Sequence, residues 1–279
     1  MILNLIINRA NPPMNTPLKS SSPITASDHD PIKNALSKVP EVTLLFWIIK
    51  IAATTLGETA GDALSMSLNL GYIVSTGIFA IIFAIAVATQ IKANSFNKWL
   101  YWATIIATTT LGTTIADYVT RSLGIGYAGG SVLLIALLGL CLITWQKTMG
   151  SIAVDSISKP KAEVFYWTTI MFSQTLGTAL GDWVADSKGM GYTTSAIIFG
   201  SLLALIALAH FYTKISKTLL FWSAFVLTRP LGAVLGDFLD KPIDHGGLAL
   251  SRFGASAALL IFIIVCLLVF KQRASAKAH

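Results

Sequence analysis

A short motif recurs four times in this chain, and each copy lies inside an apolar stretch. The copies are TLGETAGD at 55–62, TLGTTIAD at 110–117, TLGTALGD at 175–182 and PLGAVLGD at 230–237. Each copy ends in an aspartate, whose charge loses hydration in an apolar segment at a large cost in free energy. Because the arrangement is repeated at one register, the four segments are predicted to share one structural role.

The composition is that of a membrane protein. Apolar residues make up 54% of the 279 positions and charged residues 12%, whereas soluble domains contain about 25% charged residues. Cys141 and Cys266 lie in apolar runs and form neither a disulfide framework nor a zinc-binding spacing.

Eight stretches are long enough to cross a membrane, which takes about 20 apolar helical residues. We therefore expect eight transmembrane helices joined by short loops. Their expected ranges are 42–66, 72–91, 99–121, 127–146, 164–186, 192–212, 219–240 and 249–270.

The basic residues are distributed unequally between the two sides of these spans. Fourteen Lys and Arg residues fall in the two tails and in the loops after the second, fourth and sixth spans. The opposite loops contain four, namely Arg121, Lys188, Lys241 and Arg252. The positive-inside rule then predicts that both termini lie in the cytoplasm. This asymmetry also accounts for the net charge of +7, so we expect no nucleic-acid partner.

Three parts of the chain follow from this pattern. Residues 1–41 are rich in Pro, Ser, Asn and Asp and are predicted to form a disordered cytoplasmic tail. The SDHD sequence at 27–30 within it is expected to be solvated and not a metal site. Residues 42–270 form the membrane domain, with repeats at about 42–91, 97–146, 162–212 and 217–270, and residues 271–279 form a second cytoplasmic tail.

Each repeat is larger than the motif. An aromatic pair precedes every copy, and a glycine follows every aspartate after nine residues; these glycines are Gly71, Gly126, Gly191 and Gly246. The glycine is expected to let the chain turn back into a second, plainer helix. The sequence therefore predicts an all-α fold of eight transmembrane helices, arranged as four parallel two-helix hairpins around a pseudo-fourfold or doubled twofold axis. The motif helices are expected inside.

Small residues recur four positions apart in each motif. These pairs are Gly57 and Gly61, Gly112 and Ala116, Gly177 and Gly181, and Gly232 and Gly236. Such small-xxx-small spacing lets helix backbones approach closely in a membrane. The four motif helices are therefore predicted to pack against one another.

The other face of each motif is polar, and in a membrane such a face must turn inward. The expected ion-binding or pathway residues are Glu58, Asp62, Asp117, Asp182, Asp237, Thr55, Thr59, Thr110, Thr114, Thr175 and Thr178. Four aspartates at one depth are expected to share protons or to hold a cation. Because their ligands are oxygens, the four aspartates are candidate ligands for a hard divalent metal ion.

A purely structural role for these residues stays open at this point. The aspartates could cap helices or meet water at the interface, and the threonines could bond carbonyls of their own helices. Glu58 lies deeper and occurs in one copy only. Arg229 lies one turn below that depth, so we expect an Arg229–Glu58 pair that gates or neutralises the axis. Lys50 is expected to extend to the membrane interface.

The fourfold motif resembles that of a bacterial family of multi-span "membrane-anchored" proteins built from tandem copies of a repeat of unknown function. The resemblance covers residues 42–270 and rests on TLGxxx[GA]D, the aromatic pair before it and the GY after it. It implies a multi-span inner-membrane protein and supplies no activity and no catalytic residues.

These features predict a transporter or channel for a cation, either a divalent metal or a proton-coupled ion. The alternative is a membrane scaffold or sensory protein without transport activity. An enzyme is not expected, since the sequence contains neither His-Glu-x-x-His nor Gly-x-Ser-x-Gly. The expected partners are the lipid bilayer and a small inorganic cation or protons. No cofactor is expected apart from a transported divalent cation, and the oligomeric state is left open.

Overall fold

The computed structural model describes residues 38–152, 157, 159–187 and 189–275. Within these residues every regular element is a helix, and the one bridge of strand type joins Pro40 to Ala274. Residues 1–37 of the predicted N-terminal tail, with the SDHD sequence, lie outside the described residues, as do residues 276–279 of the C-terminal tail.

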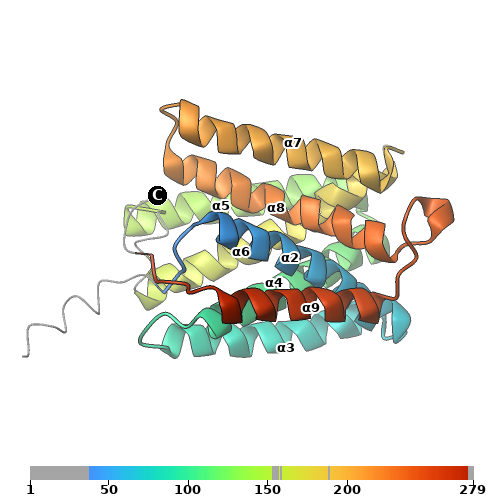
Figure 1. Cartoon of the computed structure of the whole chain (residues 1–279), viewed down its shortest axis with the longest axis horizontal. Helices are drawn as coiled ribbons and strands as arrows, with labels where there is room; N and C mark the ends of the chain where they lie inside the picture. The colour runs from blue at the N-terminus through green and yellow to red at the C-terminus, as the bar shows by residue number, and fades with distance from the viewer. Residues whose placement is uncertain (1–37, 153–156, 158, 188, 276–279) are drawn as a thin grey trace, which may run out of the picture.

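Eight long helices occupy the eight predicted spans in the described part of the chain (Figure 1). The four helices that carry the motif are α2 (Leu44–Asp62), α4 (Lys98–Asp117), α6 (Pro160–Asp182) and α8 (Lys217–Asp240). The four plainer helices are α3 (Gly71–Lys92), α5 (Gly126–Met149), α7 (Gly191–Tyr212) and α9 (Arg252–Val269). The all-α fold class predicted from the sequence is confirmed.

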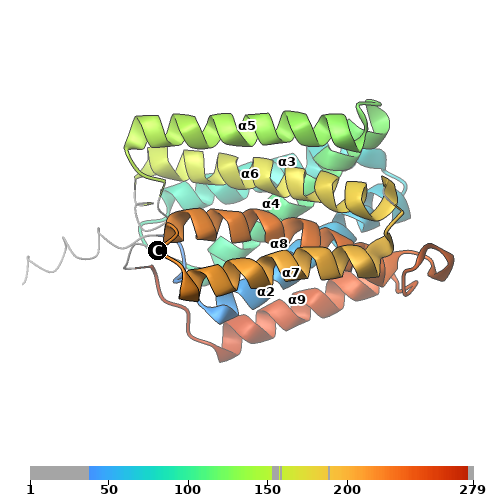
Figure 2. The ribbon, with the colours of Figure 1, turned by 90° about the horizontal axis from the view of Figure 1, so that it is seen from above.

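The motif helices form a closed inner ring. Helix α2 packs on α4, α4 on α6, α6 on α8, and α8 on α2 again. The plainer helices lie outside this ring. Figures 1 and 2 show the axes of all eight helices aligned with one another. The predicted division into inner motif helices and outer plain helices is therefore confirmed.

The outer helices do not form the expected hairpins with their own motif helices. Instead α3 packs on α4, α5 on α6, α7 on α8, and α9 on α2. Each outer helix thus covers the motif helix of the next repeat. The connecting segment, residues 63–70 in the first repeat, carries the chain sideways between the two helices. A tight hairpin turn would have kept them paired.

Six of these helices are long and apolar enough to cross a membrane, counting α2 together with the turn that follows it. The other two, α4 and α6, have similar lengths but are more polar. Most of their side chains are buried between neighbouring helices, so these two helices expose little surface that would have to match lipid. The outer helices α3, α5, α7 and α9, in contrast, are largely exposed.

The first three motif helices change geometry directly after their aspartates. Single π-helical turns follow as η3 (Ala63–Ser67), η4 (Tyr118–Ser122) and η6 (Trp183–Ser187), whereas α8 continues to Asp240 and is followed by the 3₁₀ turn η7 (Ile243–His245). Such π turns are often found at functional sites. The four predicted turn glycines then adopt φ values between +70° and +83°, which only glycine accommodates readily.

The first and last described residues lie at the same end of the bundle (Figure 1). The backbone N–H of Glu41 donates to the carbonyl of Arg273 at 2.9 Å, and Val39 and Ser275 are buried. The Lys38 ammonium lies 2.6 Å from a Glu163 carboxylate oxygen. Residues 38–41 and 271–275, which the sequence assigns to the tails, are therefore packed against the base of the ring.

Candidate functional site: an ion-paired axis inside the ring

Side chains at four-residue intervals form a buried column along the inner ring. Starting from the end where the termini lie, successive layers are Phe46, Tyr101, Tyr166 and Phe221; Lys50, Ile105, Ile170 and Phe225; Thr54, Thr109, Gln174 and Arg229; Glu58, Thr113, Thr178 and Ala233; and Asp62, Asp117, Asp182 and Asp237. Every residue in these layers is at most 5% exposed. Aromatic and aliphatic side chains, with Lys50 among them, thus close one end, and the carboxylates lie toward the other.

The motif glycines bring these layers together. A Cβ atom on Gly57, Gly112, Gly177 or Gly232 would lie closer than 3.0 Å to Thr109, Gln174, Arg229 or Thr54, respectively. Each glycine therefore packs on the axial residue of the next repeat, and the last contact closes the ring. In the second set of small residues, Gly61, Gly181 and Gly236 lie against Thr113, Ala233 and Glu58, and Ala116 is fully buried.

Arg229 and Glu58 meet at the centre of the ring. The Nη2 atom of Arg229 lies 2.8 Å from Oε2 of Glu58, and neither side chain is more than 4% exposed. The same Nη2 donates to the hydroxyls of Thr113 at 2.5 Å and Thr178 at 2.6 Å. Arg229, which comes from the fourth repeat, therefore contacts an axial residue of each of the other three.

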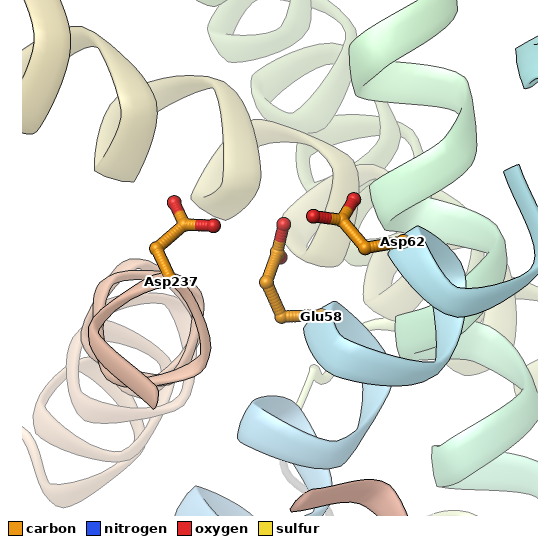
Figure 3. A group of neighbouring side chains, drawn as sticks. All are labelled: Glu58, Asp62 and Asp237. Carbon is orange, nitrogen blue, oxygen red and sulfur yellow. The ribbon is translucent and has the colours of Figure 1, made fainter. Parts of the chain in front are cut away.

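One half of the aspartate layer surrounds Lys241. The ammonium lies 2.5 Å from Oδ2 of Asp62 and 3.0 Å from Oδ1 of Asp237. Oxygens of Glu58, Asp62 and Asp237 all lie within 4.8 Å of one another, and Figure 3 shows these three carboxylates pointing into one space. Such spacing is compatible with a shared cation. In this structure the ammonium group of Lys241 is the positive charge next to these carboxylates.

Beside this half, Arg252 pairs with Asp240. Its Nε lies 2.8 Å from Oδ2 of Asp240 and 3.8 Å from Oδ2 of Asp62. The side chain of Asp240 is buried and that of Arg252 is partly exposed. The guanidinium therefore adds a second positive charge at the solvent side of Asp62.

The other half of the aspartate layer surrounds Arg121. Its Nε lies 3.2 Å from Oδ1 of Asp117, and its Nη2 lies 3.1 Å from Oδ2 of Asp182. The guanidinium also donates to the hydroxyls of Tyr127 at 3.2 Å and Tyr72 at 3.3 Å. These tyrosines belong to the GY pairs that follow the motif, so the repeat contributes them to hold Arg121.

The two halves are related by a doubled twofold pattern. In the second and fourth repeats a basic residue follows the aspartate by four positions, and it pairs with its own aspartate and with that of the next repeat. The first and third repeats have Met66 and Asp186 there instead. Glu58 breaks the symmetry, because it joins the half around Lys241 and the other half has Thr178 at the equivalent position.

The basic residues of this site, Arg121, Lys241 and Arg252, lie in the outer loops that the sequence predicts. For two of them a local signal existed, since Arg121 and Lys241 lie one helical turn after Asp117 and Asp237. Thr113, which is not among the predicted pathway residues, contacts both Glu58 and Arg229.

Five of the predicted pathway threonines do not join the central cluster. Their hydroxyls donate to carbonyls of their own helices, as seen for Thr55, Thr59, Thr110, Thr114 and Thr175. The Thr59 hydroxyl also lies 2.8 Å from that of Ser256 on α9, outside the ring. Of the threonines predicted to line the pathway, Thr178 contacts Arg229.

Aromatic residues close the axis at the end where the termini lie. The hydroxyls of Tyr101 and Tyr166 are 2.7 Å apart, and both side chains are fully buried. Lys50 lies just above this layer with its ammonium 4.1 Å from the centre of the Phe225 ring. The expectation that Lys50 extends to the interface is wrong, because the inner ring encloses its side chain completely and its Nζ atom packs over the ring of Phe225.

Comparison with known proteins gives one match. The model of a family described as Repeat of Unknown Function (DUF347) matches four tandem segments, residues 45–96, 100–151, 165–216 and 220–274. Neither a curated protein nor a solved structure matches the chain. The four matched segments coincide with the four repeats that build the ring and its outer layer. The chain therefore belongs to the family built from this repeat.

Proposed function

We propose that this chain is an eight-span inner-membrane protein with both termini in the cytoplasm. Six helices meet the length and hydropathy needed to span a bilayer, and the buried positions of α4 and α6 make their more polar sequences compatible with the same orientation. The first and last described residues lie together at one end. The excess of Lys and Arg in the loops at that end supports its placement in the cytoplasm.

Given this topology, we propose that the protein is a carrier for a small, hard cation. The observation that carries the proposal is the convergence of Glu58, Asp62 and Asp237, whose oxygens lie within 4.8 Å of one another inside the bundle. Carboxylate oxygens are the ligands that hard cations prefer. In a membrane, buried carboxylates are commonly part of an ion or proton pathway.

Charge balance in this region supports exchange of a cation or of protons. Six carboxylates lie here, those of Glu58, Asp62, Asp117, Asp182, Asp237 and Asp240. The basic side chains paired with them are Arg121, Arg229, Lys241 and Arg252. The excess negative charge would be neutralised by a bound cation or by protons shared among the carboxylates.

Lys241 has the properties of an exchangeable counter-ion in this proposal. Its ammonium is bonded to Asp62 and Asp237, yet it lies at the end of a flexible side chain that is 14% exposed. An arriving cation would take its place between the carboxylates, and the ammonium would move toward solvent. When the cation leaves, the ammonium returns and keeps the carboxylates paired.

The closed aromatic end favours a carrier over an open channel. Tyr101 and Tyr166 are completely buried at that end, whereas Lys241 and Arg121 at the other end retain partial exposure. The carboxylates themselves are buried, and the basic residues that pair with them reach solvent at one end only in this conformation. Transport would require a second conformation in which the aromatic layer separates.

The proposal is tested by cation flux in vesicles containing the purified protein, with Mn²⁺, Mg²⁺ and Ca²⁺ as probes and internal pH recorded in parallel. Glu58→Gln and Asp62→Asn are expected to reduce the flux at least about tenfold, the effect of losing about 1.4 kcal/mol of binding. Asp117→Asn, in the half without Glu58, should reduce it less. Asp244→Asn is the matched control, because Asp244 lies in an exposed turn near the same end.

A scaffold without transport activity is the second candidate, and one observation favours it. Arg121 and Lys241 each pair with aspartates of two adjacent repeats. This is the arrangement expected of residues whose role is only to hold the ring together. In that case Glu58→Gln and Asp117→Asn would leave all three fluxes unchanged while lowering thermal stability, and the carrier proposal would be wrong.

A further inference from the structure

An apolar groove lies on the outside of the bundle, separate from the ion-paired axis. It has a volume of about 490 Å³ and lies between α2, α7 and the first half of α8. Helix α7 covers α8 and α9 covers α2, so the groove lies between α7 and the junction of the first and last motif helices. Its walls include Leu44, Trp47, Leu203, Ala207 and Ala224.

The groove has the length of one membrane leaflet. Its lining on α8 extends from Lys217 to Thr228, which corresponds to about 16 Å at about 1.5 Å per helical residue. The apolar core of a bilayer is about 30 Å thick. An elongated apolar groove that covers half of this thickness has the shape of one extended acyl chain.

The polar side chains of the groove lie mainly at the end where the termini are. Lys217 is the first residue of α8, and His210 lies in the last turn of α7. Lys217 is exposed and forms no ion pair with any described residue. From residue 189 to residue 236 the sequence contains no acidic residue. Glu41 lines an adjoining cavity of about 160 Å³, which shares Thr43 with the groove, and two basic residues, Lys271 and Arg273, line that cavity with it. The mouth of the apolar groove is therefore positively charged.

We propose that this groove binds one acyl chain of an anionic phospholipid, whose phosphate group contacts Lys217 and His210. The apolar walls would hold the chain, and the basic residues at the mouth would select a headgroup with net negative charge. An anionic surface lipid is attracted by each nearby Lys or Arg with an energy that corresponds to about a fivefold preference. The inference rests on the membrane embedding proposed above and does not depend on cation transport.

Trp47 provides the measurement, because its indole lines the groove. The protein is placed in phosphatidylcholine vesicles that contain either brominated phosphatidylglycerol or brominated phosphatidylcholine, since bromine quenches tryptophan fluorescence on contact. The Trp47 signal is taken as the difference between the wild type and Trp47→Phe. Brominated phosphatidylglycerol is expected to quench this signal at about one fifth of the mole fraction that brominated phosphatidylcholine requires.

Two variants separate the headgroup from the chain. Lys217→Gln should reduce the preference for phosphatidylglycerol severalfold. The control is Lys92→Gln, which should leave this preference unchanged, because Lys92 is an exposed lysine on α3 at the same end of the bundle but away from the groove. Ala207→Phe, which fills the groove from the exposed side of α7, should protect Trp47 from both lipids.

The inference is overturned if both lipids quench the Trp47 signal equally in the wild type. It is equally overturned if Ala207→Phe leaves the quenching of Trp47 unchanged, since the chain would then lie elsewhere. Trp99, which is 42% exposed at the surface, gives the reference for quenching by bulk lipid. Flux assays play no part in this test, so its failure is distinguishable from failure of the carrier proposal.

Discussion

Arg229 and Glu58 form a buried ion pair between the last and the first motif helices, with Nη2 of the arginine 2.8 Å from Oε2 of the glutamate. The contact lies at the α8–α2 junction, where the ring closes. Gly236 and Gly232, which pack on α2 beside Glu58 and Thr54, allow the two helices to approach this closely.

The first prediction concerns this pair. Arg229→Gln is expected to lower the free energy of unfolding by about 3–5 kcal/mol, because it leaves the Glu58 carboxylate buried without its partner. Arg229→Gln combined with Glu58→Gln should recover a large part of that loss. Thermal unfolding of the two single variants and the double variant in detergent measures this coupling. Additive losses in the double variant would show that the two side chains do not depend on each other.

The second prediction concerns Lys241 as a counter-ion. In Lys241→Gln, Asp62 and Asp237 lack the ammonium, so a divalent cation should bind in its place and stabilise the fold. At a cation concentration of about 100 times Kd, the melting temperature should rise by about 5–10 °C. The wild type should respond much less. Arg121→Gln is the matched variant in the half without Glu58, and a smaller cation response is expected from it.

The third prediction concerns alkaline pH. Burial lowers the pKa of the Lys241 ammonium, but the carboxylates of Asp237 and Asp62 outweigh this effect and hold that pKa well above its usual value. The stability that the ammonium contributes is therefore fully present below about pH 10.4, the usual lysine pKa, and is lost only above it. The gap in melting temperature between the wild type and Lys241→Gln should thus narrow above about pH 10.4. A gap that narrows already near pH 8–9 would contradict this account of the pair.

The fourth prediction concerns the motif glycines. Gly57→Ala and Gly232→Ala place a methyl group against Thr109 and Thr54, and such overpacking should destabilise the protein by about 1–3 kcal/mol. Gly139→Ala and Gly200→Ala are matched controls in outer helices, where the added methyl group meets nothing within 4 Å. These two should be neutral, or stabilising by up to about 1 kcal/mol through helix propensity. If all four variants behave alike, close packing in the inner ring does not explain the motif.

The sequence predicts the helices and their inner and outer placement because both follow from local patterns. Gly57, Gly112, Gly177 and Gly232 occur at one register, and a repeated small residue implies a repeated close contact. The pairing of each outer helix with the next repeat was not predictable in the same way. A connecting segment such as 63–70 permits either a hairpin or a crossing, and its residues do not decide between them.

The candidate site was predictable only in part. The predicted polar face joined Thr55, Glu58, Thr59 and Asp62, whereas the axial residues are Thr54, Glu58 and Asp62. Positions four apart rotate by about 40° around a straight helix, so a single helix does not reveal which row stays on the axis. The neighbours decide this, and they are known only once the ring is assembled.

The crossed packing of the outer helices has a consequence for how the protein is made. Helix α2 is synthesised first, but its outer cover is α9, the last long helix of the chain, and Glu58 meets Arg229 only when α8 arrives. The half-site formed by Asp62, Asp237 and Lys241 is therefore absent from every nascent chain that ends before Lys241. In the membrane topology proposed above, Glu58 would therefore lie in the bilayer without its arginine partner until α8 has been inserted.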